Sequence, residues 1–494
     1  MRTSALVLWL FFYSYVATIF RIKVCSVSGQ SQSDQQELLL RLKNSLNSSS
    51  SEKLVKCNQS TDCYSWDGIT CNADGQVIGL DLSKQLTSGA IDKANSFTGQ
   101  IPVGISYMTK LVTLDLSKSW LLDLGSLKLK KPNLVMLVQN LTRLQNLYLD
   151  GIDISVDRYK WSQALSSSLP DLQVLSMSSC HLLGPINHSL AKLKSLSIIR
   201  LARNNLVGPL PKYFAEFQNL TSLYLVPSFT MLKALAYLNL AGNQLNGSVL
   251  STNWSSLLNL VSLNLARNSF SGTVPPTLFQ SQSLRRIYLP QNQFTGGFSK
   301  VKGEFSSLLG AIDLSHNSSV LPHEIGDFLQ VAFFFSLSGN KFHESIPKSI
   351  CQGSSLLVLD LSNNSLSGSV PECLIQMSVS LGVLNLKRNN LSSNILDILP
   401  ENCVLHTLDL SRNRLGEKVP KSLVKCRMLE VLDLGNNQID DTFPCHLKST
   451  SRLRVLVLRS NKFKGDINCR ENITWPMLQI IDLASNSFGG KLPQ

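Results

Sequence analysis

The stretch LEVLDLGNNQIDDTFPCHLKSTSR, residues 429–452, contains the pattern that decides the fold. Leucine occupies its positions 1, 4 and 6, asparagine its position 9 and isoleucine its position 11. A run of amphipathic helices would show a 3.6-residue period and no fixed asparagine. Instead the same spacing recurs along the chain every 23 to 25 residues, apart from a short step from Leu220 to Leu235, and opens at Leu172, Leu196, Leu220, Leu235, Leu260, Leu284, Leu309, Ala332, Leu356, Leu381, Leu405, Leu429, Leu453 and Leu478.

Each part of this unit has a physical role. The alternating leucines of LxL point inward from a short strand, and the residues between them face outward on a concave surface. The asparagine, as at Asn413, Asn437 and Asn461, turns inward and satisfies backbone groups at the bend. One unit buries too little apolar surface to offset its loss of conformational entropy, so the units must stack and be capped. The pattern LxxLxLxxNxL is typical of leucine-rich repeats and predicts an α/β repeat solenoid.

The N-terminus predicts entry into the secretory pathway. An apolar stretch from Ala5 to Phe20 follows a short basic start and precedes Arg21 and Lys23. This arrangement is typical of a signal peptide, which we assign to residues 1–29. A signal anchor that stays in the membrane is the alternative, and the two basic flanking residues favour it. No later window holds the about 20 apolar residues that a membrane span needs.

The mature chain divides into three regions. Residues 30–76 are expected to form an N-terminal cap, with a capping box at 34–37 and an amphipathic helix that places Leu38, Leu42 and Leu46 on one face. Residues 77–234 are irregular repeats. Residues 235–494 are regular repeats of about 24 residues.

Two seams interrupt the irregular region. Residues 88–102 contain two repeat tails with no strand motif between them, and residues 220–240 contain two strand motifs with no tail between them. A coil that short cannot complete a turn of the solenoid, so distorted stacking is expected near Leu225 to Ala234. We interpret residues 121–140 as a long insertion in the repeat pattern.

Secretion gives meaning to the N-x-S/T sequence. Each site alone is weak evidence in a chain rich in asparagine and serine, but their number suits an extracellular glycoprotein. The eleven candidates for N-glycosylation are Asn47, Asn58, Asn140, Asn187, Asn219, Asn246, Asn253, Asn317, Asn363, Asn390 and Asn472.

The helix, the cysteine-bounded loop CNQSTDCYSWDGITC, the repeat and its LxGxIP tail resemble plant extracellular leucine-rich-repeat proteins. Phrases such as MLVQNLTRLQNLYLDGIDIS and LVLRSNKFKGDINC resemble one branch of them, the receptor-like proteins of the Verticillium-wilt and leaf-mould resistance type. This resemblance implies a right-handed plant-type leucine-rich-repeat superhelix with a helical N-terminal cap. It also implies a single-pass receptor of the plasma membrane that binds a microbial or wall-derived peptide, oligosaccharide or protein ligand. Such receptors lack a kinase domain and signal through a partner receptor-like kinase.

The cap departs from the family pattern. Ser31 and Tyr64 stand where the family has cysteines, so one partner of each expected disulfide is missing. A bridge from Cys71 to Cys63 or to Cys57 remains open, with one thiol left over. These losses predict a weakened cap.

The later cysteines follow the repeat frame, which places those of neighbouring units about 5 Å apart, within disulfide range. Cys180 has no matching cysteine in the neighbouring unit, and no CxxC or histidine spacing suggests zinc. The expected staples on the convex side are Cys351 with Cys373, Cys403 with Cys426, and Cys445 with Cys469.

No motif indicates an enzyme or a cofactor. His323-Glu324 lacks the second histidine of a zinc protease, and neither a GxSxG elbow nor a kinase catalytic loop is present. The net charge of +13 is spread without the basic runs of a nucleic-acid tail. We therefore expect neither catalysis nor nucleic-acid binding.

Ligand binding is expected on the concave face. Arg388 and Arg412 fall at the same repeat position in adjacent units, which suggests a basic stripe for an acidic peptide or a uronate oligomer. The alternative is a solvated face that only keeps the array soluble. The candidate concave residues are Arg200, Arg203, Arg267, Arg285, Arg286, Tyr288, Lys387, Arg388, Arg412 and Arg459.

Three functions remain open at this point. The chain could be the ectodomain of a receptor-like protein, a secreted inhibitor of microbial wall-degrading enzymes, or a non-functional or decoy paralogue. The sequence NSFGGKLPQ ends inside a repeat tail, which is compatible with a fragment, a truncated paralogue or a misassembled gene model. The chain as given is expected to be secreted to the apoplast.

Overall fold

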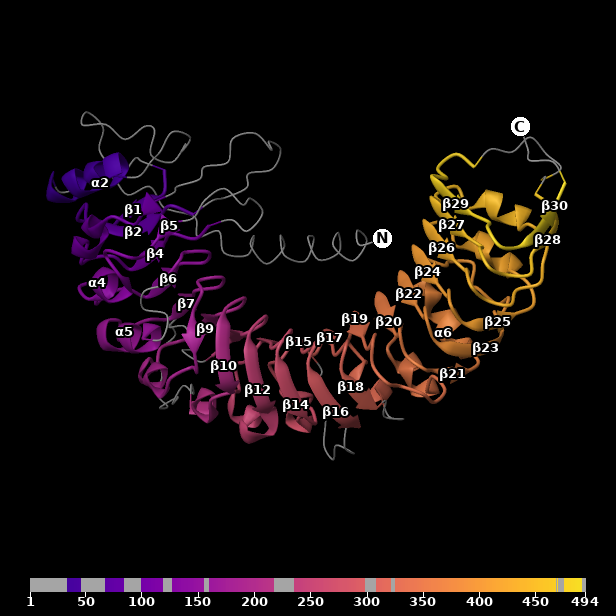
Figure 1. Cartoon of the computed structure of the whole chain (residues 1–494), viewed down its shortest axis with the longest axis horizontal. Helices are drawn as coiled ribbons and strands as arrows, with labels where there is room; N and C mark the ends of the chain where they lie inside the picture. Colours follow the sequence, from indigo (N-terminus) through magenta and orange to yellow (C-terminus); the bar gives the residue numbers. More distant parts are fainter. Residues whose placement is uncertain are drawn as a thin grey trace.

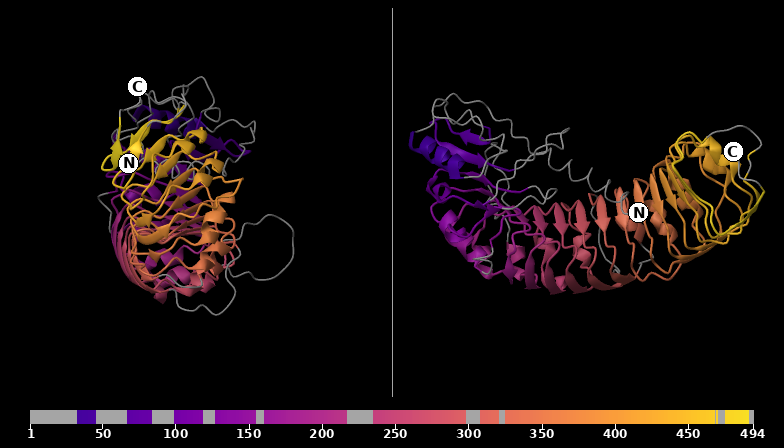
Figure 2. Two further views of the ribbon diagram at one scale, coloured as in Figure 1. Left: turned by 90° about the vertical axis from the view of Figure 1, so that its right-hand side faces the viewer. Right: turned by 45° about the horizontal axis from the view of Figure 1, so that its top comes forward.

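The computed structural model describes residues 33–45, 67–83, 99–118, 127–154, 160–216, 235–297, 308–320, 325–467, 469 and 475–490. Within these ranges the chain forms a curved array of stacked coils (Figure 1). One long sheet lines the inner side of the arc, and helices and short strands form its outer side. Figure 2 shows the same stacking of strands from two further directions.

The inner sheet has 17 strands in the described residues, and all of its neighbouring pairs are parallel except β1 with β2. In order of pairing it comprises β1 (Ile69–Cys71), β2 (Val77–Asp81), β4 (Thr113–Asp115), β6 (Asn146–Tyr148), β7 (Val174–Ser176), β9 (Ile198–Arg200), β11 (Tyr237–Asn239), β13 (Ser262–Asn264), β15 (Arg286–Tyr288), β17 (Ala311–Asp313), β19 (Phe334–Ser336), β20 (Val358–Asp360), β22 (Val383–Asn385), β24 (Thr407–Asp409), β26 (Val431–Asp433), β27 (Val455–Val457) and β29 (Ile480–Asp482).

The outer side carries shorter elements. Its strands are β3 (Gly99–Gln100), β5 (Leu127–Lys128), β8 (Leu183–Gly184), β10 (Asn205–Pro209), β12 (Gln244–Ser248), β14 (Ser269–Gly272), β16 (Gln293–Gly297), β18 (Ser318–Val320), β21 (Ser367–Gly368), β23 (Asn390–Asn394), β25 (Arg414–Gly416), β28 (Lys464–Asp466) and β30 (Ser487–Gly489). Its helices are α4 (Leu134–Val138), α5 (Trp161–Ser168), α6 (Glu372–Gln376), η2 (Val103–Tyr107), η3 (His188–Lys192), η4 (Lys212–Glu216), η5 (Val249–Ser251), η6 (Trp254–Ser256), η7 (Pro276–Leu278), η8 (Ile325–Phe328), η9 (Lys348–Gln352), η10 (Met377–Val379), η11 (Lys421–Lys425) and η12 (Cys445–Ser449).

The repeat pattern explains the inner strands. Most have three residues, and in most of these the middle one is a buried leucine or isoleucine; Phe335 takes that place in β19, and Ile481 of β29 is 46% exposed. Leu384 of β22 lies opposite Leu408 of β24, which lies opposite Leu432 of β26, and all three are at most 2% exposed. Side chains therefore stack in register along the array, while the flanking strand residues face outward.

From the coil of β9 onward, a ladder of asparagines ties each coil to the coil before it, as the sequence predicts. Asn413 Nδ2 donates to the carbonyls of Leu386 and Leu410, and its Oδ1 accepts the Leu391 N–H. The equivalent residues bond in the same way at Asn204, Asn243, Asn268, Asn292, Asn317, Asn340, Asn364, Asn389, Asn437, Asn461 and Asn486. The glycosylation candidate Asn317 is itself a ladder residue, 7% exposed, whose amide nitrogen donates to the Leu289 and Leu314 carbonyls and whose Oδ1 accepts the Phe294 N–H.

The helix α2 (Ser33–Ser45) covers the start of the array. Leu39 and Leu42 are buried against the core, whereas Leu38 is half-buried, so the buried face is turned from the expected one. Gln35 Oε1 accepts the N–H of Val77 at the beginning of β2. The signal peptide and the cap residues Leu46, Cys57 and Cys63 lie outside the described residues, together with Asn47, Asn58, Asn219 and Asn472.

The inner sheet continues past both seams. β2 pairs with β4 across the first seam, and β9 pairs with β11 across the second. The segment from Leu225 to Ala234, where distortion is expected, lies outside the described residues.

Three disulfides staple the outer side at the expected pairings, Cys351 with Cys373, Cys403 with Cys426, and Cys445 with Cys469. Each joins neighbouring coils 22 to 24 residues apart. Cys180 is a buried thiol in the ladder position of its coil, and its Sγ donates to the Leu149 carbonyl. No described helix is both long enough and apolar enough to span a bilayer.

Candidate ligand-binding surface

In the coils whose inner strand ends in aspartate or asparagine, the side chain of that residue fixes the turn that follows the strand. Asp409 Oδ1 accepts the N–H of Ser411, Asp433 Oδ1 accepts that of Gly435, and Asn385 Oδ1 accepts that of Lys387, at 3.0 to 3.2 Å. Aspartate or asparagine recurs at this strand-end position because either side chain offers the acceptor oxygen. The sequence reading missed this acidic row, although the recurring Asp/Asn between the two leucines of LxL was its signal.

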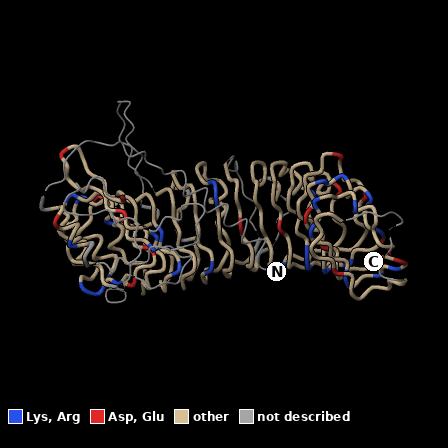
Figure 3. Tube along the Cα trace, turned by 90° about the horizontal axis from the view of Figure 1, so that it is seen from above, with Lys and Arg blue, Asp and Glu red and all other residues tan. Residues whose placement is uncertain are grey.

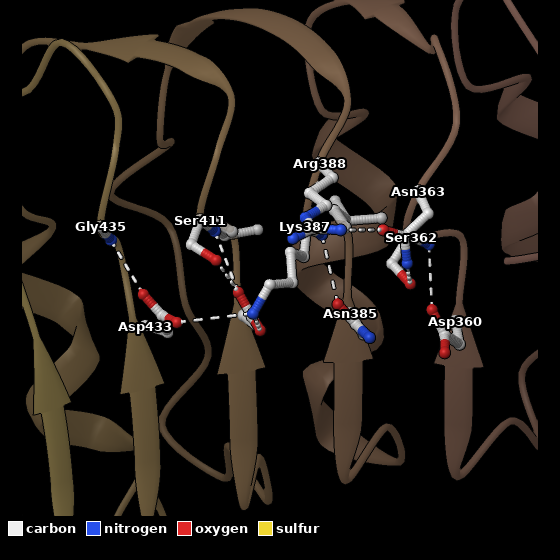
Figure 4. Close-up of polar contacts among 12 residues, drawn as sticks. Asp360, Ser362, Asn363, Asn385, Lys387, Arg388, Ser411, Asp433 and Gly435 are labelled. Atoms are coloured by element: carbon white, nitrogen blue, oxygen red, sulfur yellow. Dashed lines mark hydrogen bonds and ion pairs between the residues drawn. The ribbon is translucent and has the colours of Figure 1, made fainter. Parts of the chain in front are cut away.

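The acidic row neutralises one of the predicted binding residues. Lys387 Nζ lies 3.3 Å from Asp409 Oδ2 and 3.9 Å from Asp433 Oδ2 (Figure 4). Burial raises the pKa of Asp433, and the nearby charge of Asp409 raises it further. The Lys387 ammonium group therefore binds two neighbouring carboxylates and contributes little positive charge for binding a ligand.

Arg459 is neutralised in the same manner, because its guanidinium lies 3.1 Å from Asp482 Oδ2. Arg388 and Arg412 differ from both residues. Within the described residues, the Arg388 guanidinium bonds to a neutral group, the Asn363 Oδ1 at 3.5 Å, and Arg412 is exposed. Among the described residues, no carboxylate lies within ion-pair distance of either guanidinium.

Backbone geometry aligns these two arginines. Each is the bend residue of its coil, which we define as the residue just before the ladder asparagine. Their φ angles are 54° for Arg388 and 58° for Arg412, in the left-handed region that makes the bend. The N–H of Arg388 donates to the Ser411 carbonyl of the next coil, so the coils lie about 4.8 Å apart there. The exposed side chains of Arg388 and Arg412 therefore project from the surface side by side.

The other predicted residues lie on different coils. Arg203 and Arg267 are bend residues with φ of 55°, but the coil of β11 separates them. Arg200 ends β9. Arg285, Arg286 and Tyr288 lie together at β15, where burial raises the pKa of Tyr288. The structure brings none of these residues to the Arg388–Arg412 pair.

Charge is uneven along the array. Lys, Arg, Asp and Glu gather toward its two ends, and the central coils carry few of them (Figure 3). Burial also raises the pKa of the strand-end residues Asp313 and Asp360, and it raises that of Asp115 to about 6. In the described part of the chain, no group of three His, Cys, Asp or Glu side chains is placed to hold a metal ion.

The described glycosylation candidates fall on different surfaces. Asn187, Asn246 and Asn253 are exposed, and Asn140 and Asn390 are half-buried. Asn246 and Asn390 lie on the outer strands β12 and β23. Asn363 is the bend residue of the coil next to Arg388, with φ of 53°.

Comparisons with known proteins agree with the fold. Residues 403–463 match a family model described as Leucine rich repeat, and residues 171–193, 259–281 and 355–377 match another described as Leucine Rich Repeat. Receptor-like protein 6 of Arabidopsis thaliana is 28% identical over an alignment of 210 residues, and the match covers 33% of this chain and 20% of that protein. Receptor-like protein 54 of the same plant is 33% identical over an alignment of 266 residues, and the match covers 47% of this chain and 32% of that protein. The chain thus spans only a fifth to a third of these curated relatives.

A solved structure is similar along most of the array. It is the LRR ectodomain of the plant membrane receptor kinase GASSHO1/SCHENGEN3 from Arabidopsis thaliana in complex with CASPARIAN STRIP INTEGRITY FACTOR 2. The TM-score is 0.59 at 26% sequence identity, over 93% of this chain and 59% of that chain.

Proposed function

This chain is a leucine-rich-repeat protein of the plant receptor-like type, and from that premise we propose that it is the extracellular ligand-binding part of a defence receptor without catalytic activity. Its concave face binds an acidic ligand, either a peptide with carboxylate side chains or a uronate oligomer. The observation that carries this proposal is the pairing of Arg388 and Arg412. They are exposed bend residues of adjacent coils and have no carboxylate partner among the described residues, whereas Lys387 and Arg459 are already neutralised.

Two guanidinium groups that start about 5 Å apart can share one carboxylate or bind two successive ones. Such hydrogen bonds are charge-assisted, and planar guanidinium groups match the fork of a carboxylate. The strand-end aspartates beside the bend residues repel those anionic groups of a ligand that lie over the strands and not over the bend. This arrangement favours ligands that place their carboxylates over the bend residues and keep neutral or cationic groups over the strand ends.

Signal transfer is part of the proposal. No described helix is suited to span a membrane, and the matched relatives are longer than this chain. The similar ectodomain of GASSHO1/SCHENGEN3 was solved with a bound factor. We infer that this chain acts at the plasma membrane or in the apoplast and passes ligand occupancy to a partner receptor-like kinase.

Binding of defined acidic probes tests the ligand proposal. The secreted protein is titrated with oligogalacturonate and, separately, with a glutamate-rich peptide, by calorimetry at two salt concentrations. The R388A/R412A variant is expected to lose at least tenfold in affinity for one of the probes, which corresponds to about 1.4 kcal/mol. The wild-type affinity is expected to fall with added salt.

The matched control is R203A/R267A. It removes the same charge from the same bend position, but from coils that are not adjacent. If both double variants weaken binding equally, overall charge attracts the probe and the Arg388–Arg412 site is refuted. An R388A/R412A variant that binds both probes like the wild type refutes it as well.

A further inference from the structure

Asn363 places a glycosylation sequence on the proposed binding surface. Asn363-Asn364-Ser365 is an N-x-S/T site, and Asn363 immediately precedes Arg388 in the row of bend residues. The N–H of Asn363 donates to the Lys387 carbonyl of the next coil, and the Arg388 guanidinium touches the Asn363 Oδ1 (Figure 4). Among the described sites of this kind, it is the one that lies in the bend row with Arg388 and Arg412.

The side-chain geometry of Asn363 leaves room for the modification. Its Nδ2 donates to the Ser362 Oγ at 3.2 Å, and the side chain is half-buried. An amide nitrogen carries two hydrogens, and N-glycosylation replaces one of them. The other hydrogen can keep the bond to Ser362, and the sugar then leaves toward the exposed side. Asn317, by contrast, uses its Nδ2 for the carbonyls of Leu289, Leu314 and Ser315 inside the ladder.

We propose that Asn363 carries an N-linked oligosaccharide and that this glycan covers Arg388 and limits access to the Arg388–Arg412 site. The proposal rests on the proposed function of that site. An N-glycan is bulky and hydrophilic, and its first sugar is attached next to the guanidinium that contacts Asn363. A glycan that covers the site nine-tenths of the time leaves one-tenth of the molecules competent to bind, which weakens the apparent affinity about tenfold.

Substitutions at Ser365 separate the glycan from the arginine contact. S365A destroys the glycosylation sequence and keeps Asn363 and its contact with Arg388, whereas S365T keeps the sequence. Ser365 is exposed, and its backbone N–H bonds to the Phe342 carbonyl, which neither variant alters. Both proteins are made in glycosylating plant cells. Glycopeptide mass spectrometry measures occupancy of Asn363, and titration with oligogalacturonate and the glutamate-rich peptide measures affinity.

The expected result is an occupied Asn363 in S365T and about tenfold tighter probe binding by S365A. An unoccupied Asn363 in S365T overturns the proposal. Equal affinities of S365A and S365T also overturn it, while the proposed function survives if R388A/R412A still weakens both. If S365A binds neither probe, the acidic-ligand function fails and the glycan's role fails with it.

Discussion

The amide of Asn413 donates to the Leu386 carbonyl of the preceding coil at 3.0 Å, so a single side chain closes the bend between two repeats. The same amide donates to Leu410 and accepts from Leu391, and Asn413 is 8% exposed. Its truncation leaves the Leu391 N–H without its acceptor and removes one of the two amide donors from each of the Leu386 and Leu410 carbonyls, which keep their bonds to Asn389 and Asn437. This contact makes the ladder testable at one residue.

We expect N413A to destabilise the array by about 1–3 kcal/mol, since it leaves the Leu391 N–H unsatisfied and a buried unsatisfied group costs about that much. Chemical denaturation monitored by circular dichroism measures the change. The control is N436G, because Asn436 is exposed with φ of 56° and glycine adopts that conformation without strain. If N413A and N436G shift the denaturation midpoint equally, the hydrogen bonds of the asparagine ladder do not stabilise the stacked coils.

A substitution at Asp115 should reveal the penalty for burying a strand-end carboxylate. Burial raises its pKa from 3.8 to about 6, so the folded chain binds an extra proton between these values. Stability contributed by that proton is present at low pH and is lost as the pH rises through about 6. D115N should therefore stabilise the protein by about 1–3 kcal/mol at pH 7 and leave it unchanged near pH 4.

Asparagine suits this position, because Asn239, Asn264 and Asn385 already accept the N–H two residues on. Asp115 makes the same bond to Ser117 at 2.9 Å. Thermal midpoints of wild type and D115N are compared from pH 4 to pH 7. Curves that stay parallel over this range would show that Asp115 ionises as it does in the unfolded chain.

Much of this fold follows from the sequence because the repeat is local. The repeat period predicts where the strands lie, the leucines of LxL predict the core, and the asparagine predicts the bend. Because the repeat places residues of neighbouring coils side by side, the pairings of Cys403 with Cys426 and of Cys445 with Cys469 follow from counting residues along it. The α2 face is less predictable, since Leu39 and Leu38 are both apolar and only contact with the first coil selects Leu39.

The binding surface is harder to predict because it depends on contacts across coils. Counting places Lys387 and Arg388 on the concave face but cannot separate them. Only the structure shows that Lys387 reaches Asp409 and Asp433, while Arg388 has a neutral neighbour. A reading that included the strand-end acids together with the arginines could have found this difference.

The repeat frame also predicts a position at which an engineered disulfide can join two adjacent coils. Ser162 in α5 and Ser189 in η3 occupy outer positions of adjacent coils similar to those of Cys351 and Cys373, and their Oγ atoms lie 3.2 Å apart. S162C/S189C should form a disulfide that closes a loop of 27 residues. Loop closure of that length is worth roughly 3–4 kcal/mol.

Alkylation and mass spectrometry detect whether the new thiols are consumed, and thermal unfolding measures the gain. S162C and S189C alone are the controls, because neither can form the bridge. A double variant that keeps two reactive thiols would show that the two coils are farther apart in solution than this contact requires.

Two buried serines in the C-terminal half allow a paired test of polar burial. Ser378 Oγ has no hydrogen-bond partner in the described structure and lies in an apolar cavity lined by Leu374, Leu381 and Leu405. S378A removes an unsatisfied hydroxyl, and the Ser378 carbonyl keeps its bond to the Val404 N–H. We expect S378A to raise the free energy of unfolding by about 1 kcal/mol.

Ser422 is the matched case, since it is 8% exposed and its Oγ accepts the Leu399 N–H at 3.2 Å. S422A leaves that N–H buried without an acceptor and should lower stability by about 1–3 kcal/mol. Opposite signs for the two variants, measured by urea denaturation under identical conditions, are the expected outcome. A loss of stability in S378A comparable to that in S422A would mean that its hydroxyl bonds to water in the cavity, and that the cavity between α6 and the neighbouring coil is hydrated.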